Sequence, residues 1–465
     1  GQRGGDTPRF IANAIAWLAP RSAAARPLRI LGDPGEPAAA VLRAAGRELQ
    51  ITPARRLTEA DLASFDIAIV SPQAAHGAGR LEELDRWLRQ GGGLLAVETA
   101  WGQLQLGRAA SVHELAANRL LQDAGIAYTT AAASPVRDGL YPGRPADAAA
   151  ESRRLTANAE AALEVLAGRA AGDVGFAARV VRDALGVVPI DGPLVARVDR
   201  LAGRAEHRAA IETAWLAMRN GPIRPAEHPL ACVLIDLEAR RAAEAPPARV
   251  RAHPTAEAFP GPVAAGARPV TRRLQLDTAT PGWRSTGLWA LPGEPVTVVF
   301  GDDLDEAALA AAGLAVQIGV WRDPQQFPER VRMPQAIRRD PVDGRRVRSA
   351  SAIGGPVLID LPRGLPATLG REAIEVEIRG AVAMPRFRLG ETDLEQWRQE
   401  IRHHPAPWAE LASEHLEFTL PADVVRTLDR PDLVMEHWDR VHAAMQRLEP
   451  RSPSHWPDRP YRYVA

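Results

Sequence analysis

The chain has 465 residues, of which 57 are basic and 57 acidic, so its formal net charge at pH 7 is zero. A chain without net charge has no overall field to attract a polyanion, and we expect no nucleic-acid partner. The sequence contains no lysine, which excludes a Walker A phosphate loop, a Schiff-base nucleophile and a Ser-Lys dyad.

Cys232 is the single cysteine of the sequence, so the chain has one thiol group. One cysteine excludes an internal disulfide, a thiolate zinc knuckle and a two-cysteine redox motif. The apolar residues around it predict that Cys232 is buried. No apolar run approaches the roughly 18 residues that a transmembrane helix needs. No signal peptide is visible after Gly1, and we expect one to be absent or already removed.

Residues 1–140 are predicted to form an α/β domain. Short apolar runs alternate with helical periods, as in a doubly wound parallel sheet with helices on both faces. These runs are 28–31, 65–70 and 94–97. Ligands of such sheets bind at the carboxyl ends of the strands. The corresponding segments are 32–35, 71–76 and 98–102.

Four further regions follow in chain order. Residues 150–242 show a period of 3.6 residues with frequent alanine, which predicts a helical domain. The Pro, Ala and Arg content of residues 243–272 is typical of a linker. Short alternating segments separated by Pro-Gly, Asp-Gly and Gly-Gly turns predict a β-sandwich over 273–390. Residues 391–465 return to helical periods, so the expected fold is α/β, then all-α, then β-sandwich, then helices.

A zinc peptidase site of the His-Glu-x-x-His type needs two histidines four residues apart on one helix face. His113 and Glu114 start such a motif, but Ala117 occupies the place of the second ligand. An inverted motif fails in the same way, because Leu433 precedes Glu436 and His437 where a histidine is required. We therefore assign no catalytic, cofactor-binding or metal-binding residue in this chain.

Two other histidine pairs are poorly placed for joint chelation of a metal. His403 and His404 are adjacent, so their side chains point to different faces of one element. His437 and His442 are five residues apart, which takes them off one helix face. We interpret all four as hydrogen-bonded or solvated side chains.

The α/β region is similar to glutamine-amidotransferase-like folds, which place a cysteine at a tight turn after a strand. The expected turn lies within 91–102, where no cysteine is present. A non-catalytic version of this fold is the prediction. The alternative is hydrolysis by Glu98 with His76 approaching from an adjacent loop. The segment 282–287 does not have the spacing of a serine nucleophile elbow.

Tryptophans are frequent in the predicted sandwich, at positions 283, 289 and 321. Tryptophan rings on sandwich loops can stack on sugar rings, so Trp289 and Trp321 are the candidate glycan contacts. Packing in the core is the alternative.

The stretch Ser285-Thr-Gly-Leu-Trp-Ala-Leu-Pro-Gly-Glu294 resembles the opening of the enhancin-like M60 zinc metallopeptidase module. Further similar segments follow in the family's order. They are Val320–Pro324, Ile353–Pro362, Ala406–Leu411, Phe418–Pro421, Met435–Asp439 and the lead-in Arg462–Ala465. The segments 91–102 and 118–126 are similar to the amidotransferase-like domain of some relatives, including animal channel-associated factors.

The resemblance implies an extracellular or cell-surface peptidase that cleaves mucin-type, O-glycosylated glycoproteins with zinc. The family's His-Glu-x-x-His motif would follow the lead-in at Arg462, so we expect zinc in a catalytic half outside this chain and regard the chain as an inactive N-terminal fragment. A natural truncated homologue is the other possibility. A non-enzymatic scaffold that binds glycans or proteins is the alternative function.

Overall fold

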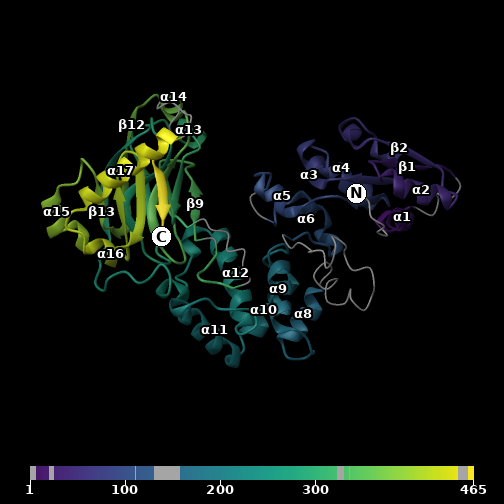
Figure 1. Ribbon diagram of the computed structural model, residues 1–465, viewed down its shortest axis with the longest axis horizontal. Helices are drawn as coiled ribbons and strands as arrows, with labels where there is room; N and C mark the ends of the chain where they lie inside the picture. The colour runs from purple at the N-terminus through teal and green to yellow at the C-terminus, as the bar shows by residue number, and fades with distance from the viewer. Residues whose placement is uncertain are drawn as a thin grey trace. The chain divides into compact units, whose positions relative to one another are not determined.

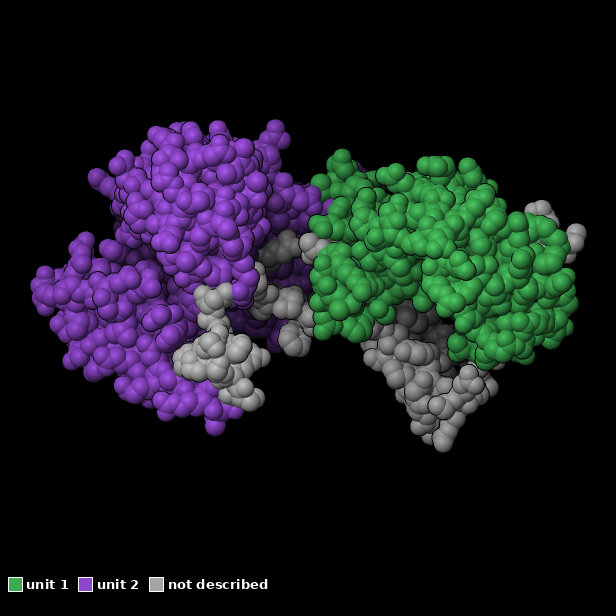
Figure 2. Space-filling model, turned by 90° about the horizontal axis from the view of Figure 1, so that it is seen from above, with its two compact units in different colours: residues 1–172, 179–199 green, residues 173–178, 200–465 purple. Residues whose placement is uncertain are grey.

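The computed structural model describes residues 7–19, 26–109, 112–129, 158–321, 329–334, 336–448 and 459–465. The chain divides into two compact units (Figure 2). The first unit comprises residues 1–172 and 179–199, and the second comprises residues 173–178 and 200–465. Within the described residues, no helix is both long and apolar enough to cross a membrane.

The first unit is built on a four-stranded parallel sheet (Figure 1). Its strand order is β2-β1-β3-β4. The strands are β1 (Leu28–Leu31), β2 (Leu49–Thr52), β3 (Ile67–Val70) and β4 (Gly93–Ala96). The helices are α1 (Thr7–Leu18), α2 (Glu36–Ala44), α3 (Pro72–Gly77), α4 (Leu81–Arg89), α5 (Ala100–Gln105) and α6 (Ala116–Leu121).

Both faces of this sheet are covered, as the prediction of a doubly wound sheet requires. Along β3, Ile67 and Ile69 belong to one hydrophobic cluster, whereas Ala68 and Val70 belong to the other. Alternate residues of a strand point to opposite faces, so the two clusters lie on the two sides of the sheet. The comparison with amidotransferase folds stays a prediction.

Gly32 ends β1 with a positive φ of 119°. A Cβ atom at this position would lie 2.3 Å from the carbonyl oxygen of Ile69. Only glycine therefore fits where β1 turns away beside β3.

The predicted helical region is helical, but it does not form a unit of its own. Its helices are α8 (Ala159–Leu166), α9 (Val174–Leu185), α10 (Pro193–Ala202), α11 (Ala205–Ala217) and α12 (Pro229–Glu244). α8 and residues 193–199 of α10 belong to the first unit, whereas α11 and α12 belong to the second. Arg197 of α10 pairs with Glu160 and Glu164 of α8, which fixes these two helices together. Residues 150–157 lie outside the described part.

The prediction that 243–272 is a linker was wrong. This segment forms two short 3₁₀ helices, Pro247–Arg249 and Pro254–Glu257, and it is a packed part of the second unit. Val250, Thr255 and Ala256 are buried. Trp408 Nε1 also donates a hydrogen bond of 2.8 Å to the carbonyl oxygen of Pro260. Proline is frequent in extended linkers, but here a proline starts each 3₁₀ helix, where its fixed φ is suitable.

The predicted sandwich region forms one eight-stranded antiparallel sheet (Figure 1). The order is β10-β7-β12-β6-β11-β8-β9, with β5 also paired to β12. The strands are β5 (Val270–Asp277), β6 (Gly282–Ala290), β7 (Val296–Phe300), β8 (Ala315–Ile318), β9 (Arg338–Pro341), β10 (Arg346–Ser349), β11 (Gly355–Leu361) and β12 (Ala373–Ala383); α13 (Glu306–Ala311) and α14 (Leu365–Leu369) accompany them.

Strand β12 changes its partner at Gly380. Ile378 and Arg379 pair with β7, whereas Ala381 to Ala383 pair with β6. Gly380 has a φ of 88°, and a Cβ atom at this position would lie 2.8 Å from the carbonyl oxygen of Pro295. All strands except β9 contribute to a single buried cluster that includes Leu288, Phe300 and Ile359. The hydrogen bonds between these strands thus form one sheet, and that sheet encloses one core. The description as a sandwich stays a prediction.

The expectation of a purely helical 391–465 was incomplete. The region contains α15 (Leu394–Gln399), α16 (Ala422–Arg426) and α17 (Pro431–Leu448), but also three strands of a four-stranded sheet in the order β13-β14-β15-β16. The strands of that sheet are β13 (Arg386–Arg388), β14 (Trp408–Ala412), β15 (Leu416–Pro421) and β16 (Tyr461–Val464). All five residues of β14 are buried, so its sequence does not alternate between apolar and polar as a half-exposed strand would.

Candidate functional site

A groove of about 670 Å³ lies in the second unit and is lined by residues of both its sheets. Four of its lining residues are Arg284 of β6, Arg386 and Arg388 of β13, and Arg459 before β16. We call it the arginine groove. Leu274 to Asp277 of β5 and Tyr461 of β16 complete two of its walls. A volume of several hundred cubic ångströms is typical of small-molecule sites.

A cluster of buried charges adjoins the arginine groove, whose lining includes Ser285 and Glu417. Glu410 is only 1 % exposed, and it accepts a hydrogen bond of 2.8 Å from Arg462 Nη1. Arg462 Nη2 donates to Glu417, and Ser285 Oγ donates to Glu410 Oε2. Arg462 Nη1 also lies 3.2 Å from Thr419 Oγ1. We refer to these five residues as the Glu410 cluster.

The strand register explains why these residues meet. Arg386, Glu410 and Thr419 are direct neighbours across β13, β14 and β15, and Glu417 is the neighbour of Arg462 across β15 and β16. Neighbouring side chains on one face of a sheet lie within contact distance. Ser285 comes from β6, so the cluster also connects the four-stranded sheet to the eight-stranded sheet.

The electrostatics of the Glu410 cluster are those of a compensated buried pair. Burial acts to raise the pKa of Glu410, but Arg462, Arg386 and Ser285 outweigh it and the pKa is lowered. Burial raises the pKa of Glu417, and only part of that effect is offset by Arg462. Burial would lower the pKa of Arg462, yet the two carboxylates raise it. Glu410 and Arg462 are therefore held in their charged forms.

Two stacked histidines lie at another wall of the groove. The rings of His415 and His442 are 5.1 Å apart at an angle of 23°. Burial lowers the pKa of His442, and the neighbouring His415 lowers it further, while Asp439 opposes both. Ser413 Oγ donates a hydrogen bond of 2.6 Å to Asp439. Both imidazole rings line the groove, where their nitrogens are potential hydrogen-bonding groups.

The structure corrects the prediction that Trp289 and Trp321 contact glycans. Trp289 is 0 % and Trp321 5 % exposed. The ring of Trp321 packs edge-on against Trp289, Phe259 and Trp408, at centroid distances of 6.3, 4.8 and 5.0 Å. Both tryptophans are thus core residues, and neither presents a ring face on which a sugar could stack. The Val320–Pro324 motif extends beyond the described residues after Trp321.

The predicted ligand edge of the parallel sheet does bring two of its residues together. Ser71 follows β3 and Glu98 follows β4, and Ser71 Oγ donates a hydrogen bond of 3.1 Å to Glu98. The backbone N–H of Gln73 donates to the same oxygen at 3.0 Å. His76 is exposed near the end of α3. Glu98 is therefore held at the start of α3 by Ser71 and Gln73, and this arrangement does not support the His76–Glu98 hydrolase.

The other histidines occupy separate environments. His113 lies 3.2 Å from the carbonyl oxygen of Val187, and His404 lies 3.2 Å from that of Met384. His437 is exposed, whereas His442 is buried on another face of α17. In the described ranges, no group of three or more His, Cys, Asp or Glu side chains is placed to hold a metal ion. Cys232 is buried, as predicted.

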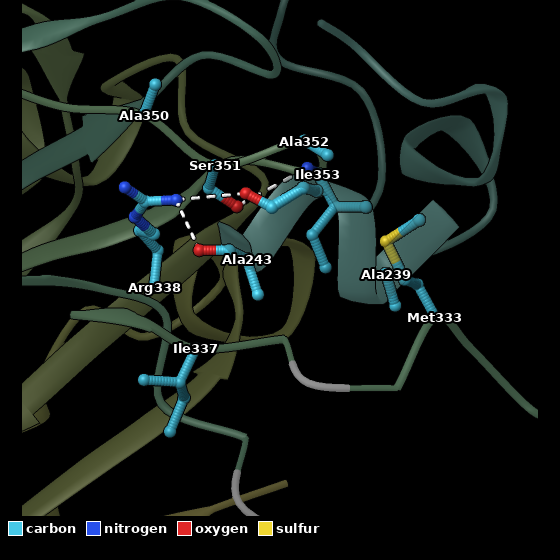
Figure 3. Close-up of a pocket in the computed structure, with 10 residues that line it drawn as sticks. Ala239, Ala243, Met333, Ile337, Arg338, Ala350, Ser351, Ala352 and Ile353 are labelled. Atoms are coloured by element: carbon cyan, nitrogen blue, oxygen red, sulfur yellow. Dashed lines mark hydrogen bonds between the residues drawn. The ribbon is translucent and has the colours of Figure 1, made fainter. Parts of the chain in front are cut away.

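A second cavity, of about 20 Å³, lies beside the end of α12 (Figure 3). Arg338 Nη1 donates hydrogen bonds of 2.9 Å to the carbonyl oxygens of Ala242, Ala243 and Ala245. This arginine satisfies carbonyl groups that the helix leaves without intrahelical partners. The space holds about one water molecule, so it is part of a helix cap and not a ligand site.

Two family models match the second unit. The model of the N-terminal domain of M60-like peptidases matches residues 265–391, and that of peptidase M60, enhancin and enhancin-like, matches residues 380–465. Residues 265–465 of this chain thus match the enhancin-like M60 peptidase family. The M60 matches begin just before β5 and end with β16, so they include every strand that lines the arginine groove.

Named relatives match a similar share of the chain. The TRPM8 channel-associated factor homolog of Xenopus laevis is 35% identical over 196 residues, which are 41% of this chain and 20% of the relative. TRPM8 channel-associated factor 1 of Homo sapiens is 35% identical over 185 residues, 39% of this chain and 19% of that protein. The matched part thus spans about a fifth of the length of these relatives.

Solved structures show weaker similarity. IMPa from Pseudomonas aeruginosa, in complex with an O-glycopeptide, covers 95% of this chain and 52% of its own, at 15% identity and a TM-score of 0.36. The ZmpB metallopeptidase from Clostridium perfringens covers 42% of this chain and 44% of its own, at 14% identity and a TM-score of 0.32.

The residues of the arginine groove and of the Glu410 cluster were not predicted as site residues. Glu410 lies in the segment Ala406–Leu411 and Arg462 in the lead-in Arg462–Ala465, both of which carried the family resemblance. The available signal was a glutamate in the middle of an otherwise apolar strand. A buried charge needs a partner, but the sequence does not show which arginine supplies it.

Proposed function

We propose that this chain is part of a zinc metallopeptidase of the M60 family that acts on glycoproteins of the mucin type outside the cytoplasm. The match of residues 265–465 to that family carries the proposal. The residues described here do not fit a zinc site, and the sequence contains no His-Glu-x-x-His motif. Zinc would be bound by a segment outside these residues, and we derive no step of the reaction through it.

The contribution of this chain, in our proposal, is a rigid support for the catalytic half. The Glu410 cluster supports this role, because it connects strand β6 of the first M60 segment to strands β14, β15 and β16 of the second. Three charged side chains held together at 9 % exposure or less restrict how the two sheets can move. Strand β16, which would lead into the catalytic half, is fixed at Arg462.

The test is to determine the reading frame beyond codon 465 and to express its complete product. We expect bound zinc and cleavage of an O-glycosylated mucin that a chelator abolishes and added zinc restores. The same mucin without its glycans should be cleaved poorly. The 465-residue chain serves as a control and should leave both substrates intact. Absence of zinc from the complete product, or equal cleavage of both substrates, would contradict the proposal.

A scaffold without enzyme activity is the second candidate, and the similarity to TRPM8 channel-associated factors favours it. Under this alternative the complete product binds no zinc and cleaves no mucin, but it retains a protein or glycoprotein partner on a column. The same preparation therefore decides between the two candidates.

A further inference from the structure

We propose that the arginine groove binds an organic carboxylate or sulfate, with Arg284 and Arg386 as the side chains that hold the oxyanion. This inference is independent of the peptidase proposal, because it concerns a binding site formed by the described residues alone. It rests on three observations, namely the composition of the groove, the partners that its carboxylates already have and the donors that its guanidinium groups keep available.

Three of the four carboxylates that line the groove already have partners. Asp277 accepts hydrogen bonds of 2.9 Å from the backbone of Ala279 and from Thr280 Oγ1. Glu391 lies 3.3 Å from Arg388. Glu417 pairs with Arg462 inside the Glu410 cluster. None of these contacts involves Arg284 or Arg386.

Neighbouring guanidinium groups repel one another in and beside the groove, although its lining carries four carboxylates, Asp277, Glu391, Glu414 and Glu417, as well as four arginines. Burial lowers the pKa of Arg272, and repulsion from Arg386 lowers it further. Burial is likewise the main cause that lowers the pKa of Arg284; Glu417 and Asp277 oppose it, while Arg388 and Arg386 add to it. A bound anion would relieve this repulsion.

The guanidinium groups of Arg284 and Arg386 keep donors available. Arg284 Nη2 donates a hydrogen bond of 2.7 Å to the carbonyl oxygen of Thr280, but its buried Nε has no hydrogen-bond partner among the described residues. Arg386 Nε lies 3.3 Å from Glu410 Oε2 without hydrogen-bond geometry. Glu410 is already occupied by Arg462 and Ser285. Buried donors of this kind favour a ligand with strong acceptor oxygens, and guanidinium groups match carboxylate and sulfate well.

The other walls fit a ligand larger than a free ion. Gln275, His415 and Tyr461 line the same groove and offer an amide, an imidazole and a phenol ring. Such groups bind hydroxyl groups and ring faces. We therefore expect an organic anion of about monosaccharide size or larger.

The experiment measures binding of three probes to the 465-residue chain by ligand-observed NMR. Glucuronate carries a carboxylate, glucose 6-sulfate carries a sulfate, and glucose is the neutral control of the same ring size. We expect at least one of the two anions to bind and glucose not to bind. Which anion binds more tightly assigns the ligand as a carboxylate or a sulfate. Affinity should fall as salt is added, because the contact is ionic.

Two substitutions at one residue connect the binding to the groove. Arg284→Gln should weaken anion binding by about 10-fold or more, since it removes charged hydrogen bonds. Arg284→Lys keeps the charge but loses the fork of donors, so a smaller loss is expected. Arg348→Gln is the matched control, because Arg348 is an exposed arginine of β10 in the same unit and does not line the groove.

The urea midpoint of each variant shows whether it is folded, and Arg284→Lys carries the test if Arg284→Gln is not. Three results would overturn the proposal: no binding of either anion, equal binding of glucose, or the same loss in Arg348→Gln as in Arg284→Gln. None of them depends on zinc or on cleavage, so failure here is distinct from failure of the peptidase proposal.

Discussion

Arg462 of β16 donates a hydrogen bond of 2.8 Å to Glu410 of β14, although β15 lies between the two strands. Both side chains are less than 10 % exposed, at 9 % and 1 %. The pair therefore reaches across the middle strand inside the protein. An ion pair of this kind is costly to break from one side, because the remaining charge stays buried without compensation.

Replacing Arg462 by methionine should strongly destabilise the second unit. Glu410 and Glu417 would both lose their main partner, and loss of one partner of a buried pair costs about 3–5 kcal/mol. Urea denaturation followed by tryptophan fluorescence measures the effect. Arg379→Met is the control, because Arg379 forms a more exposed pair with Glu377, and its midpoint should change far less. Equal effects of the two substitutions would show that the Glu410 cluster has no special role.

The stability of the second unit should fall between pH 6.5 and about pH 4 because of His253. Burial lowers the pKa of His253 from 6.5 to about 4. The unfolded chain therefore takes up a proton in this range while the folded protein does not. The contribution of His253 is fully present above pH 6.5 and is lost as the pH falls, by up to about 3 kcal/mol.

His253→Asn should flatten this part of the pH dependence. The backbone N–H of Thr255 donates to His253 Nδ1 at 3.3 Å, and asparagine can accept the same hydrogen bond at the start of the 3₁₀ helix. Asparagine does not titrate. The variant therefore removes the proton uptake of residue 253 but keeps its hydrogen bond at the start of the 3₁₀ helix. Urea midpoints measured from pH 4 to pH 7 check this. An unchanged slope in the variant would assign the pH dependence to other groups.

Trp321→Ala should destabilise the protein rather than remove a glycan contact. Trp321 is buried among Trp289, Phe259 and Trp408, and truncation of a buried tryptophan costs about 3–5 kcal/mol. Trp438→Ala is the matched control, because Trp438 is 42% exposed and packs mainly on Phe418. Its loss should cost about 1 kcal/mol. Urea midpoints of both variants provide the measurement, and a stable Trp321→Ala chain would reinstate an exposed role for this tryptophan.

Glu98→Ala should loosen the start of α3 in the first unit. The carboxylate accepts hydrogen bonds from Ser71 Oγ and from the backbone of Gln73, and loss of charged hydrogen bonds costs about 1–3 kcal/mol. Faster amide hydrogen exchange at Gln73 and a lower thermal midpoint are the expected signs. Glu82→Ala is the control, because Glu82 is an exposed carboxylate of α4. Protection at Gln73 that does not change would contradict the anchoring role.

Three of the four strands of the first unit, β1, β3 and β4, could be predicted because their patterns are local. Ile67 to Val70 is a short apolar run that ends at Ser71-Pro72, and such a run predicts a buried strand wherever it occurs. The sequence likewise supported the burial of Cys232, and the order of short motifs from Ser285 onward supported the M60 family. These conclusions needed only neighbouring residues or their order along the chain.

The tertiary structure alone decided how distant segments combine. Burial of Trp289 and Trp321 depends on Phe259 and Trp408, which are far away in sequence. The segment 243–272 is packed because its few apolar residues meet a surface that other strands provide. Arg386, Glu410 and Arg462 meet because the register of strands β13 to β16 places them there, and register is set by long-range pairing that local patterns do not encode.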